Sequence, residues 1–214
     1  MLAVIRHGQA EGNTSHRFIG WSDVRLDDLG RRQAELLAPR LARFGVDRIV
    51  SSGIPRAVET ARPLADRLGL DVEIDDRFRE IDNGEWTGLL PTEIEQGWPE
   101  MWHAYVSGED VPRPGGERWA DVRLRVRRGL EELSRTGGIT AVFTHAGPVM
   151  LAAEWALHLT LPGNIFRGTL ASPANTSITS IDAGKLVTYA DAGHLGITVR
   201  TDVPYAAVTD VPEE

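Results

Sequence analysis

The sequence predicts an α/β fold, a three-layer α/β/α sandwich with a mostly parallel central sheet. Two observations indicate it. Short apolar runs of strand type alternate along the chain with longer segments of helical periodicity, which is typical of βαβ units. Two of these runs, residues 2–5 and 141–144, are each followed within two residues by a histidine. In a parallel sheet both histidines would lie at the carboxyl edge, where ligands bind.

Each element is placed by its own local signals. We expect strands at residues 2–5, 47–52, 70–74 and 141–144, and a late hairpin of 177–181 with 186–190. We expect helices over 31–44, 55–68 and 117–135, and a last helix from the residues after His145 to about Leu159. Pro55 in the first turn and Gly69 just beyond the end delimit the second helix. The third helix carries an apolar stripe of Trp119, Val122, Val126, Leu130 and Leu133.

One segment breaks this alternation, and no internal repeat is present. Between residues 77 and 117, aromatic residues gather with glycines and prolines, which predicts loops and one or two short helices over the sheet edge. We therefore expect a single domain over 1–195, in which 77–117 form a cap insertion, and a C-terminal tail over 196–214. Core packing is the expected role of the cap tryptophans. The wall of a substrate pocket is the alternative role for Trp86, Trp98 and Trp102.

The composition narrows the possible functions. The chain has 214 residues, 42% hydrophobic and 25% charged, as is ordinary for a globular domain. The net charge of −8 argues against nucleic-acid binding, so any functional positive charge must be concentrated locally. The chain has no cysteine, which excludes thiol catalysis, disulfides and cysteine-based metal sites. The first residues do not form a basic segment followed by a long apolar run, as a signal peptide would, and no apolar run is long enough to cross a bilayer. We therefore expect no membrane partner and a cytoplasmic location.

Charged and titratable side chains converge on the predicted carboxyl edge of the sheet. The residues that follow the four strands in turn are Arg6 with His7, Arg56, Glu80 and His145. Arginine forks match phosphate oxygens, and helix N-termini offer unpaired N–H groups. A neutral imidazole can attack phosphorus, and Glu80 is the best-placed acid for a leaving alkoxide. We therefore expect a phosphoryl ligand at this edge, with neither a metal nor a cofactor.

A series of short motifs supports this chemistry. In order they are Arg6-His7-Gly8-Gln9-Ala10-Glu11-Gly12-Asn13, Leu26-Asp27-Asp28-Leu29-Gly30, Ser51-Ser52 with Arg56-Ala57 and Thr60-Ala61, Arg79-Glu80-Ile81-Asp82-Asn83-Gly84-Glu85-Trp86-Thr87-Gly88, Pro114-Gly115-Gly116-Glu117, His145, Asn175-Thr176-Ser177 and Gly193-His194-Leu195. Together, over about residues 1–195, they resemble the histidine phosphatase superfamily, in the branch of the phosphoglycerate mutase-like enzymes. Two positions depart from the family pattern. Ala146-Gly147-Pro148 follows the second histidine where Gly-Gly is usual, and Ala10 replaces a common threonine.

The resemblance implies a role for each candidate residue. His7 would be the nucleophile that becomes phosphohistidine, and Glu80 would be the proton donor. The phosphoryl group would be bound by Arg6, Arg56, His145 and the loop residue Asn13. Arg17 is a candidate for binding a substrate carboxylate or phosphate. A solvated loop position without a functional role is an equally good interpretation of this residue. Structural or solvent-facing positions are expected for the other histidines, His16, His103, His158 and His194.

The expected function is that of a metal-independent phosphomonoesterase, a histidine phosphatase whose partner is a small phosphorylated metabolite. A cofactor-dependent phosphoglycerate mutase would use the same residues. The segment between Glu80 and His145 is shorter than the mutases of the family usually have, which favours the phosphatase. A non-catalytic phospho-ligand binding module is the second alternative, and it would have no need of the acid. The substrate stays open between a sugar phosphate, a phosphoglycerate derivative and α-ribazole phosphate. A homodimer also stays open.

Overall fold

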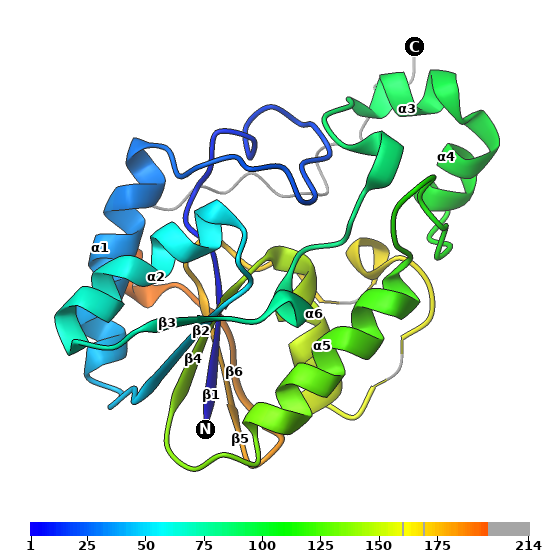
Figure 1. Cartoon of the computed structure of the whole chain (residues 1–214). Helices are drawn as coiled ribbons and strands as arrows, with labels where there is room; N and C mark the ends of the chain where they lie inside the picture. The colour runs from blue at the N-terminus through cyan, green and yellow to red at the C-terminus, as the bar shows by residue number, and fades with distance from the viewer. Residues whose placement is uncertain (160, 169, 197–214) are drawn as a thin grey trace.

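A six-stranded sheet of order β3-β2-β4-β1-β5-β6 forms the centre of the computed structural model, which describes residues 1–159, 161–168 and 170–196. The strands are β1 (Leu2–Arg6), β2 (Arg48–Ser51), β3 (Val72–Ile74), β4 (Thr140–Thr144), β5 (Ile178–Asp182) and β6 (Lys185–Asp191). The first four run parallel to one another, whereas β5 is antiparallel to β1 and to β6. The predicted α/β sandwich with a mostly parallel sheet is confirmed (Figure 1).

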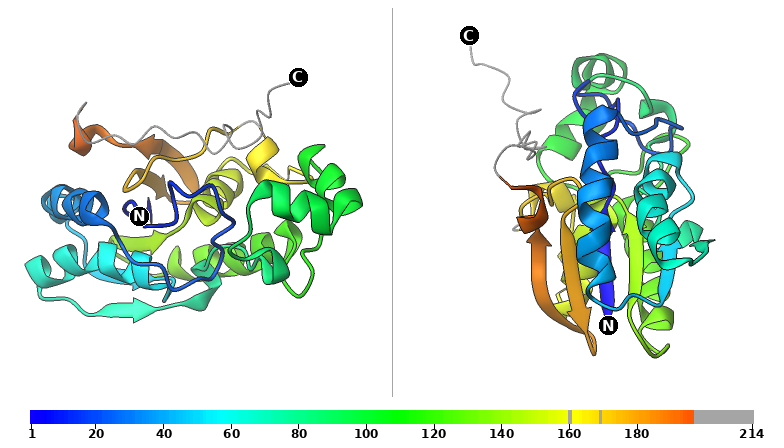
Figure 2. Two further views of the ribbon diagram at one scale, coloured as in Figure 1. Left: turned by 90° about the horizontal axis from the view of Figure 1, so that it is seen from above. Right: turned by 90° about the vertical axis from the view of Figure 1, so that its left-hand side faces the viewer.

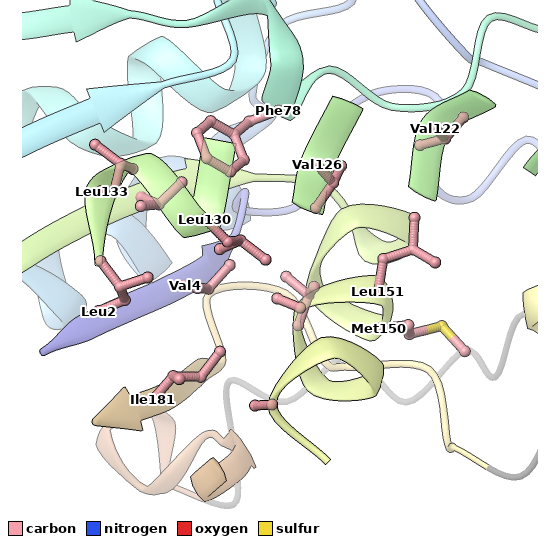
Figure 3. Close-up of a cluster of buried hydrophobic side chains, with 14 of the residues drawn as sticks. Leu2, Val4, Phe78, Val122, Val126, Leu130, Leu133, Met150, Leu151 and Ile181 are labelled. Atoms are coloured by element: carbon pink, nitrogen blue, oxygen red, sulfur yellow. The ribbon is translucent and has the colours of Figure 1, made fainter. Parts of the chain in front are cut away.

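Helices cover both faces of this sheet. The long ones are α1 (Asp28–Ala42), α2 (Pro55–Leu68), α5 (Trp119–Leu133) and α6 (Ala146–Ala156). Successive side chains of a strand point to opposite faces, and β1 shows the division. Ala3 and Ile5 pack in one cluster with residues of α1 and α2, whereas Leu2 and Val4 pack in the other with α5 and α6. Figure 2 shows α1 in front of the sheet, and Figure 3 shows the cluster around Val4 on the opposite face.

The register of the central strands brings the two predicted histidines together. In the parallel pair of β1 and β4, Arg6 lies opposite Thr144, so the next residue of each strand is a histidine. The backbone N–H of His7 donates to the Thr144 carbonyl at 2.8 Å. Strand pairing over 138 residues of sequence therefore places His7 beside His145.

Most predicted elements are present, with shifted ends. Helix α1 begins at Asp28 rather than residue 31 because Asp27 caps it, with its Oδ1 accepting from Gly30 N at 2.8 Å. Helix α6 ends at Ala156 rather than near Leu159. His158 there takes a left-handed conformation with φ 55°, which usually favours glycine and which the sequence does not signal.

The segment 77–117 lies at the carboxyl end of β1 as a set of short helices and loops (Figure 1). It contains the 3-10 turn Gly84–Trp86 and the helices α3 (Pro91–Gly97) and α4 (Pro99–Val106). An aromatic cluster holds it together, in which Phe18, Trp86, Trp102 and Tyr105 are buried against one another. The division into a domain over 1–195 with a cap insertion remains a prediction. Apart from Gly196, the predicted tail over 196–214 lies outside the described residues.

Among the described residues, no helix has the length and apolar character needed to cross a membrane.

Candidate active site

A pocket of about 120 Å³ lies at the carboxyl edge of the sheet, beneath the cap. The predicted site residues that line it are Arg6, His7, Asn13, Arg17, Arg56 and Glu80. His145 is fully buried and does not line it. Its ring centroid nevertheless lies 5.1 Å from that of His7. The structure thus gathers the predicted residues around one cavity, with His145 as a buried neighbour.

The hydrogen bonds of His7 define which ring nitrogen carries the proton. Nδ1 lies 2.6 Å from the carbonyl oxygen of Gly8, which can only accept, so Nδ1 is the protonated nitrogen. Arg56 Nε donates to His7 Nε2 at 3.2 Å, which requires a lone pair on Nε2. Burial, followed by the positive charges of Arg56 and Arg6, holds the pKa of His7 well below 6.5. His7 is therefore neutral near pH 7, with Nε2 available as a nucleophile.

The backbone around His7 is fixed from both sides. Asn175 Nδ2 donates to the His7 carbonyl at 2.9 Å, and the backbone N–H of Thr176 donates to the same oxygen at 3.3 Å. Thr176 has φ 56°, an uncommon conformation for a β-branched residue. On the next residue, Gly8 N donates to Thr60 Oγ1 at 2.9 Å. The imidazole therefore stands on a backbone with little freedom to move, as a nucleophile requires.

Arg56 is a buried cation in the first turn of α2, with 3% of its surface exposed. Nη2 donates to Gly20 O at 2.8 Å and Nη1 to Ser22 O at 3.0 Å, so the loop after Asn13 holds the guanidinium in place. Burial lowers the pKa of Arg56 to about 10, which leaves it charged at neutral pH. Arg6, the other predicted cation, donates from Nη1 to the carbonyl of Pro173 at 2.6 Å.

His145 directly precedes α6, and its side chain contacts the residue that follows the second strand. Its Nε2 lies 2.8 Å from Ser52 Oγ, directly after β2. Its Nδ1 is buried and has no hydrogen-bond partner among the described residues. Burial, followed by the charge of Arg56, holds the pKa of His145 well below 6.5. A buried ring nitrogen without a hydrogen-bond partner is unusual in a folded protein, and here it lies next to His7.

Glu80 is the carboxylate of this pocket. Its Oε2 accepts from Gly147 N at 3.2 Å and its Oε1 from Ile81 N at 3.0 Å. The close approach depends on glycine, because a Cβ at residue 147 would lie 2.4 Å from Oε1 of Glu80 and 2.7 Å from the Trp119 ring. Asp82 and Glu85, the acidic residues that follow Glu80 in the same motif, do not line the pocket.

Asn13 and Arg17, the two candidate residues in the loop after β1, differ in their contacts. Asn13 Oδ1 accepts from Ala10 N at 2.8 Å, which leaves its amide Nδ2 as the donor that the side chain can offer in the pocket. Arg17 is exposed and bonds to the cap, with Nη1 donating to Gly88 O at 2.6 Å and to Glu93 Oε2 at 3.1 Å. It therefore lines the pocket and at the same time joins the loop to the cap.

Sequence reasoning missed several residues of the pocket wall. Those with the clearest contacts are Tyr105, Arg113, Trp119, Phe166 and Asn175. Trp86, Trp98 and Trp102 do not line the pocket, and Trp86 and Trp102 are core residues. The exposed His16 lines it as well. Within the described part of the chain, no group of three or more histidines and carboxylates is placed to hold a metal ion.

The two buried histidines should make the folded protein less stable in mild acid. Their pKa values lie well below 6.5, whereas the unfolded chain protonates near 6.5, so below that pH the unfolded state binds more protons. Stability present above pH 6.5 is then lost as the pH falls toward the folded-state pKa, by up to about 1.4 kcal/mol per histidine per pH unit. Urea unfolding at pH 7.5, 6.5 and 5.5 measures this slope.

In His145→Gln one titrating group is lost, so the unfolding free energy should fall less steeply with pH, by up to about 1.4 kcal/mol per pH unit. Glutamine retains a hydrogen-bonding group near Ser52, so the variant should still fold. The control is His103→Gln, at an exposed position in α4. An equal slope in the wild type and in His145→Gln would contradict the prediction.

Comparison with known proteins gives a family and several close structures. The family model of the histidine phosphatase superfamily (branch 1) matches residues 2–189. Glucosyl-3-phosphoglycerate phosphatase of Mycolicibacterium vanbaalenii is 40% identical over 156 residues, which are 73% of this chain and 69% of that protein. Phosphoserine phosphatase 1 of Hydrogenobacter thermophilus is 38% identical over 135 residues, which are 63% of this chain and 64% of that protein.

Among solved structures, mycobacterial glucosyl-3-phosphoglycerate phosphatase in complex with inorganic phosphate has a TM-score of 0.75 and 29% identity. The alignment covers 90% of this chain and 98% of that one. An uncharacterized protein of Mycobacterium bovis is 36% identical over 159 residues, which are 73% of this chain but only 44% of the length of that protein. This chain therefore spans less than half of that longer relative.

Proposed function

Because the chain belongs to branch 1 of the histidine phosphatase superfamily, we propose that it is a phosphomonoesterase that hydrolyses a small organic phosphate through a phosphohistidine at His7. One observation carries the proposal. The lone pair of His7 Nε2 faces a buried arginine in a pocket that also contains a carboxylate. This arrangement supplies a nucleophile, a charge complementary to a phosphoryl group and a proton donor in one cavity. The phosphatase names of the relatives support the same activity.

In the first step, Nε2 of His7 would attack phosphorus, and the bond from phosphorus to the ester oxygen would break. The leaving alkoxide would take a proton from the Glu80 carboxyl group. Arg56 Nε, which donates to His7 Nε2 when no ligand is bound, would then donate to a phosphoryl oxygen. Donors for the remaining charge would be Arg6, Asn13 and the buried His145.

In the second step, water would attack the phosphorus of phosphohistidine. The Glu80 carboxylate left by the first step would take a proton from this water, and His7 would leave with its electron pair on Nε2. Inorganic phosphate is then the product, and both residues return to their starting states. Glu80 thus serves as acid and then as base, which requires one carboxyl group at a fixed position.

The positive charge that divalent cations supply in many phosphoryl-transfer enzymes would come here from Arg6 and Arg56. We therefore expect steady phosphate release from alkyl phosphates in the presence of EDTA, at the rate measured without it. Release that stops on chelation and returns with Mg²⁺ would contradict this assignment of charge.

The same assay separates the phosphatase from the mutase and from a binding module. We expect negligible interconversion of 2- and 3-phosphoglycerate even when 2,3-bisphosphoglycerate is added as a primer. Rapid isomerisation with little phosphate release would favour the mutase, and binding of phosphate esters without any turnover would favour the module. The cytoplasmic location and the homodimer remain predictions from the sequence.

A further inference from the structure

The backbone that bears Glu80 belongs to no helix or strand. Residues 79–83 run between the 3-10 turns Asp76–Phe78 and Gly84–Trp86, so no strand pairing orders this stretch. Its carbonyl groups still need hydrogen-bond donors where they are shielded from water. Three carbonyls in and next to this stretch accept hydrogen bonds from one side chain, that of Arg125 in the middle of α5.

Arg125 uses all five of its N–H groups. Nη1 donates to the carbonyls of Arg77 at 2.8 Å and Arg79 at 2.6 Å, and Nη2 donates to the carbonyl of Glu80 at 2.8 Å. The two remaining N–H groups, on Nε and Nη2, bind Oε1 and Oε2 of Glu117 at 2.9 and 2.8 Å. A planar guanidinium can hold three carbonyls and a carboxylate at once, whereas a lysine ammonium has only three donors on one nitrogen.

Glu117 is itself attached to the same stretch of backbone. Its Oε2 accepts from Asp82 N at 3.0 Å, and its own backbone N–H donates to the Asp82 carbonyl at 2.9 Å. This close approach depends on glycine, because a Cβ at residue 116 would lie 2.4 Å from the Asp82 carbonyl oxygen. The motif Pro114-Gly115-Gly116-Glu117 thus brings a carboxylate to Arg125 and to the segment that bears the proposed proton donor.

The two polar ends of Glu80 have different partners. Its carbonyl accepts from Arg125 and, at 2.7 Å, from Trp21 Nε1, which uses both lone pairs of the oxygen. Its carboxylate lies in the pocket, where Gly147 N and Ile81 N donate to it. Holding the carbonyl therefore sets the direction in which the side chain leaves the backbone. Arg125 does not line the pocket, so it is not placed to touch a substrate.

We infer that Arg125 is a positioning residue for the proton transfer: by holding the backbone of residues 77–80, it keeps the Glu80 carboxyl group within reach of the leaving oxygen. The inference rests on the proposed phosphatase function and adds to it a residue outside the pocket. A general acid must lie within hydrogen-bond reach of the atom that it protonates. A displacement of about 1 Å can lower a rate on the order of 10²-fold. Loss of Arg125 should therefore weaken protonation of the leaving group more than attack by His7.

A purely structural role for the pair of Arg125 and Glu117 predicts a different result. Damage to the fold removes active enzyme and lowers the rates for all esters by the same factor. Loss of proton donation depends on the leaving group instead, because an alkoxide needs a proton and p-nitrophenolate does not. Benzyl phosphate and p-nitrophenyl phosphate, which are of similar size, provide this contrast.

The readout is the ratio of kcat/KM for benzyl phosphate to kcat/KM for p-nitrophenyl phosphate, measured on one preparation. The fraction of folded enzyme cancels in this ratio, so a poorly folding variant still gives an answer. We expect Arg125→Met to lower the ratio by about 10- to 100-fold, the scale of a misplaced catalytic group. Arg125→Lys should recover part of it, since the ammonium keeps a charge beside Glu117 and some of the donors.

The matched control is Arg128→Met, which removes an exposed arginine of the same helix and should leave the ratio unchanged. An unchanged ratio in Arg125→Met, or an equal fall in Arg128→Met, would overturn the inference.

A double substitution shows whether the effect passes through Glu80. In the Glu80→Gln background there is no acidic proton left to position, so adding Arg125→Met should change the ratio by no more than about twofold. A second fall as large as that in Arg125→Met alone would mean that the two residues act independently, and the positioning role would then be wrong.

Failure of the proposed function gives a different pattern. If the wild type releases phosphate from neither ester, the phosphatase proposal is wrong and the inference falls with it. If the wild type cleaves both esters and Arg125→Met keeps the ratio, the phosphatase stands and only the positioning role is overturned.

Discussion

His7→Ala should lower kcat by about 10⁴- to 10⁶-fold, the scale on which loss of an enzyme nucleophile reduces turnover. The reason is geometric. Nε2 of His7 is the ring nitrogen with the lone pair, and its tautomer is set by the Gly8 carbonyl on one side and by Arg56 on the other. Arg56 and a bound water cannot replace a covalent carrier of the phosphoryl group.

Rapid quench with a ³²P-labelled ester should trap a phosphoenzyme that is labile in acid and stable in base. The label should be absent from His7→Ala and present in the control His103→Ala, which removes an exposed imidazole of the cap. Label on His145 in the wild type would reverse the roles of the two histidines and overturn the mechanism.

Glu80→Gln should lower kcat for alkyl phosphates by about 10²- to 10⁴-fold, the usual contribution of a general acid. Glutamine keeps the size of the side chain and can still accept a hydrogen bond from Gly147 N, but its amide is not acidic enough to protonate a leaving alkoxide. The loss should be much smaller for p-nitrophenyl phosphate, whose leaving group departs without a proton.

The control for this experiment is Glu85→Gln, an exposed acid five residues away that does not line the pocket. Equal losses on both kinds of ester would show that Glu80 positions the substrate and does not protonate it. KM and kcat measured separately would then locate the defect in binding.

The fold and the centre of the site could be predicted because their signals are local. Apolar runs with β-branched residues identified β1 and β4, and the residue after each strand identified the histidines. Pro55 and Gly69 predicted both ends of α2, since Pro55 is its first residue and Gly69 ends it with φ 66°. Each of these signals depends on a few neighbouring residues.

The rest of the pocket could not be predicted, because it depends on contacts between distant segments. Arg113 looks like any loop arginine in the sequence, and only the fold surrounds it with three rings. Asn175 meets the His7 carbonyl across 168 positions of the chain. The need for glycine at residue 147 appears only when Glu80 and Trp119 are placed against it.

The central place of β1 has a consequence for how the protein is made. β1 precedes its partners β4 and β5 in the chain, and the residues that pair with it follow about 140 to 180 positions later. At about 5–20 residues per second, roughly 10–35 s pass before both partners exist. Until then at least one edge of β1 lacks its native neighbour, so the nascent chain carries an incompletely paired strand-forming segment. His7, which follows β1 directly, is thus synthesised well before His145, and it can reach its final environment only after both partner strands exist.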